Sequence, residues 1–128
     1  MIHALMAGKD KTVFSEIETI LADNQIMSTW CGSGKAALSK LSKSPDYLVI
    51  VDENLPDMTG PAFVENLVLQ NPMTNCVVAS ALSSKKFHEV YEGFGVLMQF
   101  PDVPGKKDAL KLIKHLELIF QLHGQNSI

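Results

Sequence analysis

The sequence predicts an α/β protein in which a five-stranded parallel sheet is covered by helices on both faces. Short apolar runs alternate five times with segments of helical periodicity, and the run Leu48-Val49-Ile50-Val51 is apolar at every position. A continuous apolar run is typical of a strand that is buried on both faces, as in parallel sheets. Because crossovers between parallel strands are right-handed, the alternation predicts a doubly wound (βα)5 sandwich.

The amino-terminal part of the chain contains two predicted strand and helix pairs. Residues 2–6 form a short apolar strand, and from Thr12 onward apolar side chains recur at helical spacing. Residues 26–30 are predicted to be the second strand. The short helix 35–41 that follows ends before Ser44, because a residue that precedes proline avoids helical conformations.

Three further strand and helix pairs are predicted in the rest of the chain. Pro61 lies near the start of a helix, where its missing N–H costs little, and Asn71-Pro72 ends that helix. Gly93 and Gly95 break the next helix. In chain order the predicted elements are strand 47–51, the helix from Thr59-Gly60-Pro61, strand 76–79, the helix after Ser83-Ser84, strand 96–100 and helix 106–122.

Length and composition indicate one domain. A chain of 128 residues with 46% hydrophobic residues can bury one substantial core, which we place in residues 1–123, with a disordered tail at 124–128. The net charge of -3 and the lack of a Lys or Arg run argue against direct nucleic-acid binding. No apolar stretch reaches the roughly 18 residues that span a bilayer, and no signal peptide is evident. We therefore expect a cytoplasmic protein without a membrane partner.

Three segments of the sequence carry a resemblance to the receiver domain of two-component response regulators. Residues 45–60, PDYLVIVDENLPDMTG, resemble its phosphoacceptor region almost residue for residue. Residues 77–81, VVASA, resemble its fourth strand with the hydroxyl residue that follows, and residues 93–101 have the spacing of its fifth-strand block. The resemblance covers nearly the whole chain. It implies a flavodoxin-like fold with strand order 2-1-3-4-5 and a role in a two-component phosphorelay.

The resemblance also implies a role for each residue at one edge of the sheet. Asp52, at the carboxyl end of its strand, would accept a phosphoryl group from a histidine kinase, and Ser80 would bond to that group and so sense it. Asp52 and the backbone carbonyl of Asn54 would help to hold Mg²⁺, which prefers oxygen ligands. Fixed positive charge is needed at this edge because the transferred group is itself negatively charged.

The sequence differs from the receiver pattern at positions that carry charged side chains in that family. The acid pair at the end of the first strand is replaced by Ala7 and Gly8, which makes a bound Mg²⁺ doubtful. The lysine that precedes the fifth-strand proline is replaced by Phe100, and the switch aromatic by Leu97. Loss of one preorganised group commonly costs about 3 kcal/mol of transition-state stabilisation. The sequence therefore predicts a pseudo-receiver that is phosphorylated very slowly or not at all.

Two residues of the loop after the first strand are alternatives for the missing groups. Asp10 could turn inward as a metal ligand, or Lys9 could place its ammonium group beside Asp52. In the second case a Lys9→Ala change should raise the pKa of Asp52. A solvated loop with neither role is a third reading.

The last predicted helix has more apolar residues than one face needs, which often indicates a partner. In receivers the fourth helix, fifth strand and fifth helix form the output and dimer face. By resemblance this face would include Tyr91, Phe94, Leu97 and Leu112. The alternative is a helix end that is covered by the tail, and a homodimer is left open.

Three functions follow from these observations. The first is a receiver-like signalling module that acts by protein contacts with a histidine kinase or another signalling protein. The second is a receiver that is phosphorylated on Asp52, and the third is a flavodoxin-like binder of a small ligand. An enzyme is not expected, because no base, nucleophile and oxyanion-binding group converge in the sequence.

Overall fold

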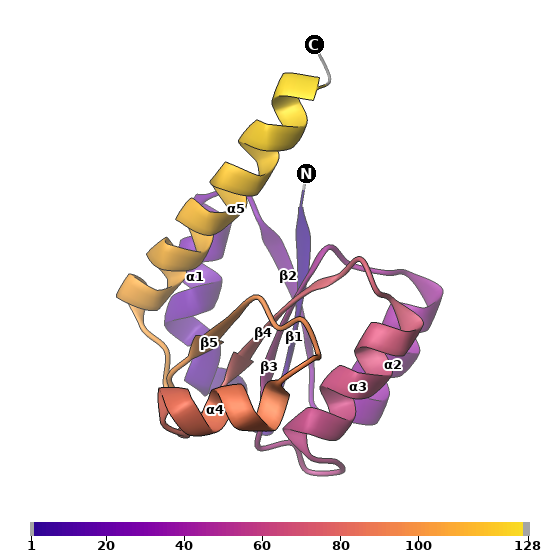
Figure 1. The fold of residues 1–128 in the computed structure, drawn as a ribbon. Coiled ribbons are helices and arrows are strands. Elements are labelled where there is room, and N and C mark those ends of the chain that lie inside the picture. Colours follow the sequence, from indigo (N-terminus) through magenta and orange to yellow (C-terminus); the bar gives the residue numbers. More distant parts are fainter. Residues whose placement is uncertain (1, 127–128) are drawn as a thin grey trace.

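The computed structural model describes the backbone of residues 2–126 and the side chains of residues 2–119 (Figure 1). Strands and helices alternate along the chain as the sequence predicts. The elements are β1 (His3–Ala7), the 3-10 helix η1 (Lys11–Phe14), α1 (Ser15–Asp23), β2 (Met27–Cys31), α2 (Gly34–Lys43), β3 (Leu48–Asp52), α3 (Gly60–Gln70), β4 (Asn75–Ala79), α4 (Ser84–Tyr91), β5 (Met98–Phe100) and α5 (Lys106–Asn126).

The five strands form one parallel sheet in the order β2-β1-β3-β4-β5. This order confirms the doubly wound, flavodoxin-like (βα)5 fold. Residue Ala7 pairs with Val51, and Asp52 pairs with Ala79, so the carboxyl ends of β1, β3 and β4 meet at one edge of the sheet. That edge is where open α/β sheets bind their ligands.

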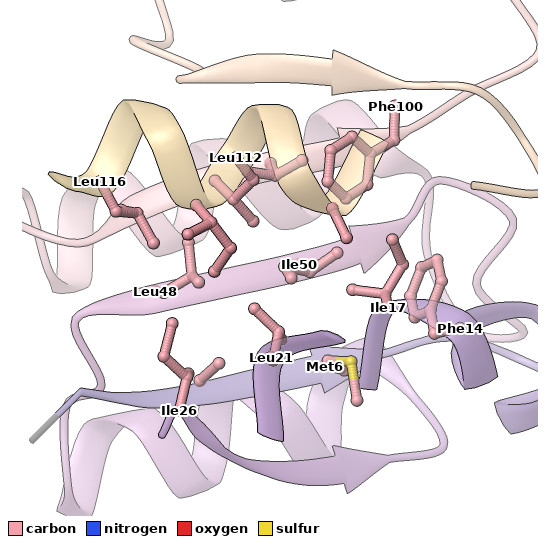
Figure 2. Packing of buried hydrophobic residues seen from close by; sticks show 14 of the residues in the cluster. Met6, Phe14, Ile17, Leu21, Ile26, Leu48, Ile50, Phe100, Leu112 and Leu116 are labelled. Carbon is pink, nitrogen blue, oxygen red and sulfur yellow. The ribbon is translucent and has the colours of Figure 1, made fainter. Parts of the chain in front are cut away.

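Helices cover both faces of the sheet, with α1 and α5 on one face and α2 and α3 side by side on the other (Figure 1). The alternation of side chains along β3 divides the core in two, because Leu48 and Ile50 point to one layer and Val49 and Val51 to the other. Figure 2 shows the first layer, in which Leu112 and Leu116 of α5 lie over β3. Both layers are needed to explain why β3 is apolar at every position.

Most boundaries lie within one or two residues of the sequence-based expectation, and those of β5 and α5 are two that differ. The chain passes through Gly93 and Gly95 at φ values of 85° and 69° before strand β5, which begins at Met98 rather than at residue 96. Helix α5 continues to Asn126 and so includes residues 124–126 of the expected tail. Residues 127–128 of that tail lie outside the described residues. No helix within residues 2–126 is long and apolar enough to cross a membrane.

Candidate functional site

Asp52 is a buried carboxylate at the carboxyl edge of the sheet. It ends β3 and is 8% exposed, and its Oδ1 accepts a hydrogen bond of 2.9 Å from the backbone N–H of Asn54. Burial raises the pKa of Asp52, and the nearby charges of Glu53 and Asp102 raise it further, whereas the Asn54 N–H and the Lys9 charge act in the opposite direction. The raised pKa means that the surroundings do not fully compensate a negative charge at this position.

Both Asp52 and an aromatic ring lie close to Gly8. A Cβ atom at Gly8 would lie 3.0 Å from the Asp52 Cβ and 3.1 Å from Cη2 of Trp30. Trp30 extends from β2, and its ring packs edge-on against Phe14 with 6.0 Å between the ring centroids. The position where the family carries an acid therefore has little room for any side chain.

Ser80 follows β4, and its hydroxyl is bonded to Glu53 rather than to Asp52. The Ser80 side chain is 2% exposed. Its Oγ donates to Oε2 of Glu53 at 2.6 Å and accepts from the backbone N–H of Leu82 at 3.0 Å. A hydroxyl has one proton to donate, so this proton is already used by Glu53.

Glu53 also binds the end of α4. The hydroxyl of Tyr91 donates to Oε1 of Glu53 at 2.8 Å, and Tyr91 is 4% exposed. Burial and the Glu53 carboxylate both raise the pKa of Tyr91. A Cβ atom at Gly60 would collide with the Tyr91 hydroxyl and with Glu53, so this arrangement requires glycine at position 60. We call the group of Ser80, Glu53 and Tyr91 the Glu53 bridge.

The loops around Asp52 are anchored to their neighbours. Asp57 accepts hydrogen bonds of 2.9 Å from the backbone N–H groups of both Gly34 and Lys35 at the start of α2, and these bonds lower its pKa. The side-chain amide of Gln99 in β5 donates to the carbonyl of Leu82 at 2.9 Å and to that of Ser80 at 3.3 Å. The segments after β3 and after β4 are thus both fixed by side chains.

Asp10 does not supply a ligand beside Asp52, contrary to one of the alternatives above. Its Oδ1 accepts from the backbone N–H and from the hydroxyl of Thr12, at 3.0 and 2.7 Å, which lowers the pKa of Asp10. Asp10 is therefore the exposed N-cap of η1. Lys9 is exposed too, and its charge is the weakest of the influences on the pKa of Asp52.

The residues at this edge do not fit a magnesium ion of the receiver kind. Ala7 and Gly8 offer no side-chain oxygen, and Asn54 is exposed and forms an isolated bridge with Thr59. Among the described residues no three His, Cys, Asp or Glu side chains converge as metal ligands would. Mg²⁺ usually takes one or two carboxylates together with water. Asp52 is the one carboxylate of the receiver ligand set that remains, and the neighbouring Glu53 carboxylate is bonded to Ser80 and Tyr91 instead.

The expected partner face is only partly exposed. Leu112 is fully buried and Tyr91 nearly so, because both belong to the core, and this part of the expectation is wrong. Phe94 and Leu97 are half-buried. A groove of about 530 Å³ lies where α4, β5 and α5 meet. It is lined by Ser84, Phe87, His88, Tyr91, Glu92, Gly93, Gly95, Val96, Leu97, Met98, Gln99 and Lys111.

Two residues that shape the site were not foreseen from the sequence. Glu53 follows Asp52 directly, and a charged residue after an apolar strand is an ordinary loop signal. Trp30 lies on the edge strand, and its exposure could not be judged from the sequence. One feature of the sequence does point to a role for Glu53. Ser80 and Tyr91 carry hydroxyl groups that can donate to a carboxylate, and both belong to elements that reach the same edge.

Solved structures with a similar fold include those of response regulators. The chemotaxis response regulator CheY4 of Vibrio cholerae is 20% identical with a TM-score of 0.80, and the match covers 90% of this chain and 98% of that one. The Francisella response regulator 1452 receiver domain is 22% identical with a TM-score of 0.79, covering 96% and 99% of the two chains. NtrX from Brucella abortus is 15% identical with a TM-score of 0.81, covering 98% of this chain and 29% of that one.

At such identities these likenesses show the fold, and the family follows from the sequence itself. Comparison with curated proteins gives no match. The family model of the response regulator receiver domain, however, matches residues 5–97, which include Asp52, Glu53 and Ser80. Taken with the position of Asp52 at the edge of the sheet, this match means that the chain belongs to the response regulator receiver domain family of two-component signalling.

Proposed function

We propose that this chain is a pseudo-receiver, which signals by protein contacts and is phosphorylated on Asp52 very slowly or not at all. The observation that carries the proposal is the packing at Gly8, where Asp52 and Trp30 occupy the space that the second acid of the family would need. Without that acid, Mg²⁺ loses a ligand and the phosphoryl group loses the positive charge that would stabilise its transfer.

The other end of the site supports the same proposal. Phe100 stands where the family has its lysine, and its ring is 1% exposed within the core. A buried phenyl ring cannot stabilise developing negative charge, and loss of one preorganised charge commonly costs about 3 kcal/mol in the transition state. The acid and the lysine are both missing, so the expected penalty exceeds that of either loss alone.

The groove between α4, β5 and α5 is the surface that we propose for the contacts. It combines half-buried apolar residues, Leu97 and Met98, with polar ones at its margin, His88 and Lys111. A mixed surface of this kind suits a protein partner, since an interface has an apolar centre and a polar rim. The partner would be a histidine kinase or another signalling protein in the cytoplasm, and no catalytic activity of the chain itself is proposed.

The test is the intact mass of the protein after incubation with Mg²⁺ and a small-molecule phosphodonor. We expect no phosphoryl adduct on the parent chain or on an Asp52→Asn variant. A receiver that has the full acid pair and lysine should gain an adduct under the same conditions and serves as the positive control. An adduct on the parent that is missing from Asp52→Asn would overturn the proposal and identify a phosphorylation-competent receiver.

A further inference from the structure

We propose that Glu53 is a positioning residue that takes the place of a phosphoryl group as the acceptor of the Ser80 hydroxyl and thereby holds α4 in one position, whatever the state of Asp52. The signalling meaning of this inference rests on the proposed function. The bridge itself can be tested without it. Ser80 and Tyr91 each bind a different oxygen of the Glu53 carboxylate, at 2.6 and 2.8 Å.

The first step of the argument is competition for one proton. The Ser80 hydroxyl donates to Glu53, and at the same time its oxygen accepts from the Leu82 N–H at 3.0 Å. A distance of 2.6 Å between a hydroxyl and a carboxylate oxygen is typical of a strong, charge-assisted hydrogen bond. A phosphoryl group on Asp52 could bind Ser80 only if this bond were first broken.

The second step concerns the attachment of α4. Phe87 and Tyr91 are the buried residues of this helix, and their rings are stacked with 4.5 Å between centroids. Phe87 packs by apolar contact, which permits small shifts of the helix. The hydrogen bond from Tyr91 to Glu53 is directional, so it fixes the carboxyl end of α4 relative to β3 and β4.

The third step is the fit of the surrounding backbone. Gly60 leaves the space that the Tyr91 hydroxyl and the Glu53 side chain share. The side-chain amide of Gln99 donates to the Ser80 and Leu82 carbonyls, at 3.3 and 2.9 Å. Because α4 and β5 line the same groove, the Glu53 bridge also sets the shape of the proposed contact surface.

Amide hydrogen exchange along the chain tests the bridge in three variants. Tyr91→Phe removes one hydroxyl, Glu53→Ala removes the shared carboxylate, and Glu89→Gln is the control on the exposed side of α4, where Glu89 pairs with Lys86 at 3.8 Å. We expect exchange in residues 84–91 to become about tenfold faster in the first two variants, since a hydrogen bond to a charged group is lost. Glu89→Gln should leave exchange in α4 unchanged.

Two comparisons separate positioning from a general loss of stability. Amides of β3 and β4 should keep their protection in Tyr91→Phe, whereas global destabilisation would speed their exchange together with that of α4. The double variant Glu53→Ala/Tyr91→Phe should exchange no faster in α4 than Glu53→Ala alone. Asp52→Asn should leave α4 unchanged. Unaltered exchange of α4 in both Tyr91→Phe and Glu53→Ala would overturn the inference, whatever the outcome of the phosphodonor experiment.

Discussion

At the scale of single residues, the site is defined by what fills the space around Asp52. From the sequence alone, Gly8 is only a position where an acid of the receiver pattern is missing. In the structure it is also a position of close contact, because Trp30 and Asp52 lie within 3.1 Å of a Cβ atom placed there. Restoring the acid alone would therefore meet a steric barrier before it could bind a metal.

The crowding at Gly8 predicts a coupled effect on stability. Gly8→Ala should lower the free energy of unfolding by about 1–3 kcal/mol, as overpacking does, and Trp30→Phe in the same chain should recover part of the loss. Gly32→Ala is the matched control, since nothing lies within 4 Å of its added Cβ. Urea unfolding followed by circular dichroism measures the parent, these three variants and Trp30→Phe alone. Equal effects of Gly8→Ala with and without Trp30 would contradict the packing described.

The raised pKa of Asp52 predicts how stability depends on pH. A carboxyl whose pKa is higher in the folded state binds its proton more tightly there, so its favourable contribution is complete below the unfolded pKa and is lost as pH rises through the folded one. Asp52→Asn should therefore be more stable than the parent at pH 7 and lose this advantage below about pH 4. Urea unfolding at the two pH values checks the sign. A destabilised Asp52→Asn at pH 7 would show that the carboxylate is compensated after all.

At the scale of elements, the sequence predicts the order of strands and helices but not their mutual anchoring. Apolar runs and helical spacing are local signals, and they located all five strands. The link from Asp57 to the start of α2 joins residues that are 23 and 22 positions apart. Local patterns carry no information on such a contact, and for the same reason the burial of Tyr91 and Leu112 was missed.

Two side chains cap the start of α2, and we predict that removing either one destabilises the protein. Ser33 accepts from the Ala36 N–H at 3.1 Å, and Asp57 accepts from the two N–H groups before it. Ser33→Ala should cost about 1 kcal/mol. Asp57→Asn should lower the melting temperature more at pH 7 than at pH 3, because a carboxyl with a depressed pKa contributes stability above the unfolded pKa that is progressively lost as pH falls through the folded one. Thermal unfolding at pH 7 and at pH 3 is the measurement. An equal change in the melting temperature of Asp57→Asn at the two pH values would contradict the prediction.

At the scale of the whole molecule, the two core layers have different relations to the site. Tyr91 and Phe87 belong to the layer under α2, α3 and α4, which the Glu53 bridge joins to the acceptor edge. Phe100 and Trp30 pack in the layer under α1 and α5, or against it. The phosphoacceptor segment of the family is kept, and its strand lies between the two layers. At the positions of the missing acid and lysine, Gly8 and Phe100 are instead closely packed.

Helix α5 gives the last prediction, because two of its leucines separate packing from surface. Leu112 is fully buried over β3, as Figure 2 shows, whereas Leu110 is 46% exposed. Leu112→Ala should therefore lower the free energy of unfolding by about 2–5 kcal/mol. Leu110→Ala should change it by no more than about 0.5 kcal/mol. Urea unfolding of the two variants is the measurement. Similar losses in the two variants would mean that α5 packs against the sheet through a face other than the one that carries Leu112.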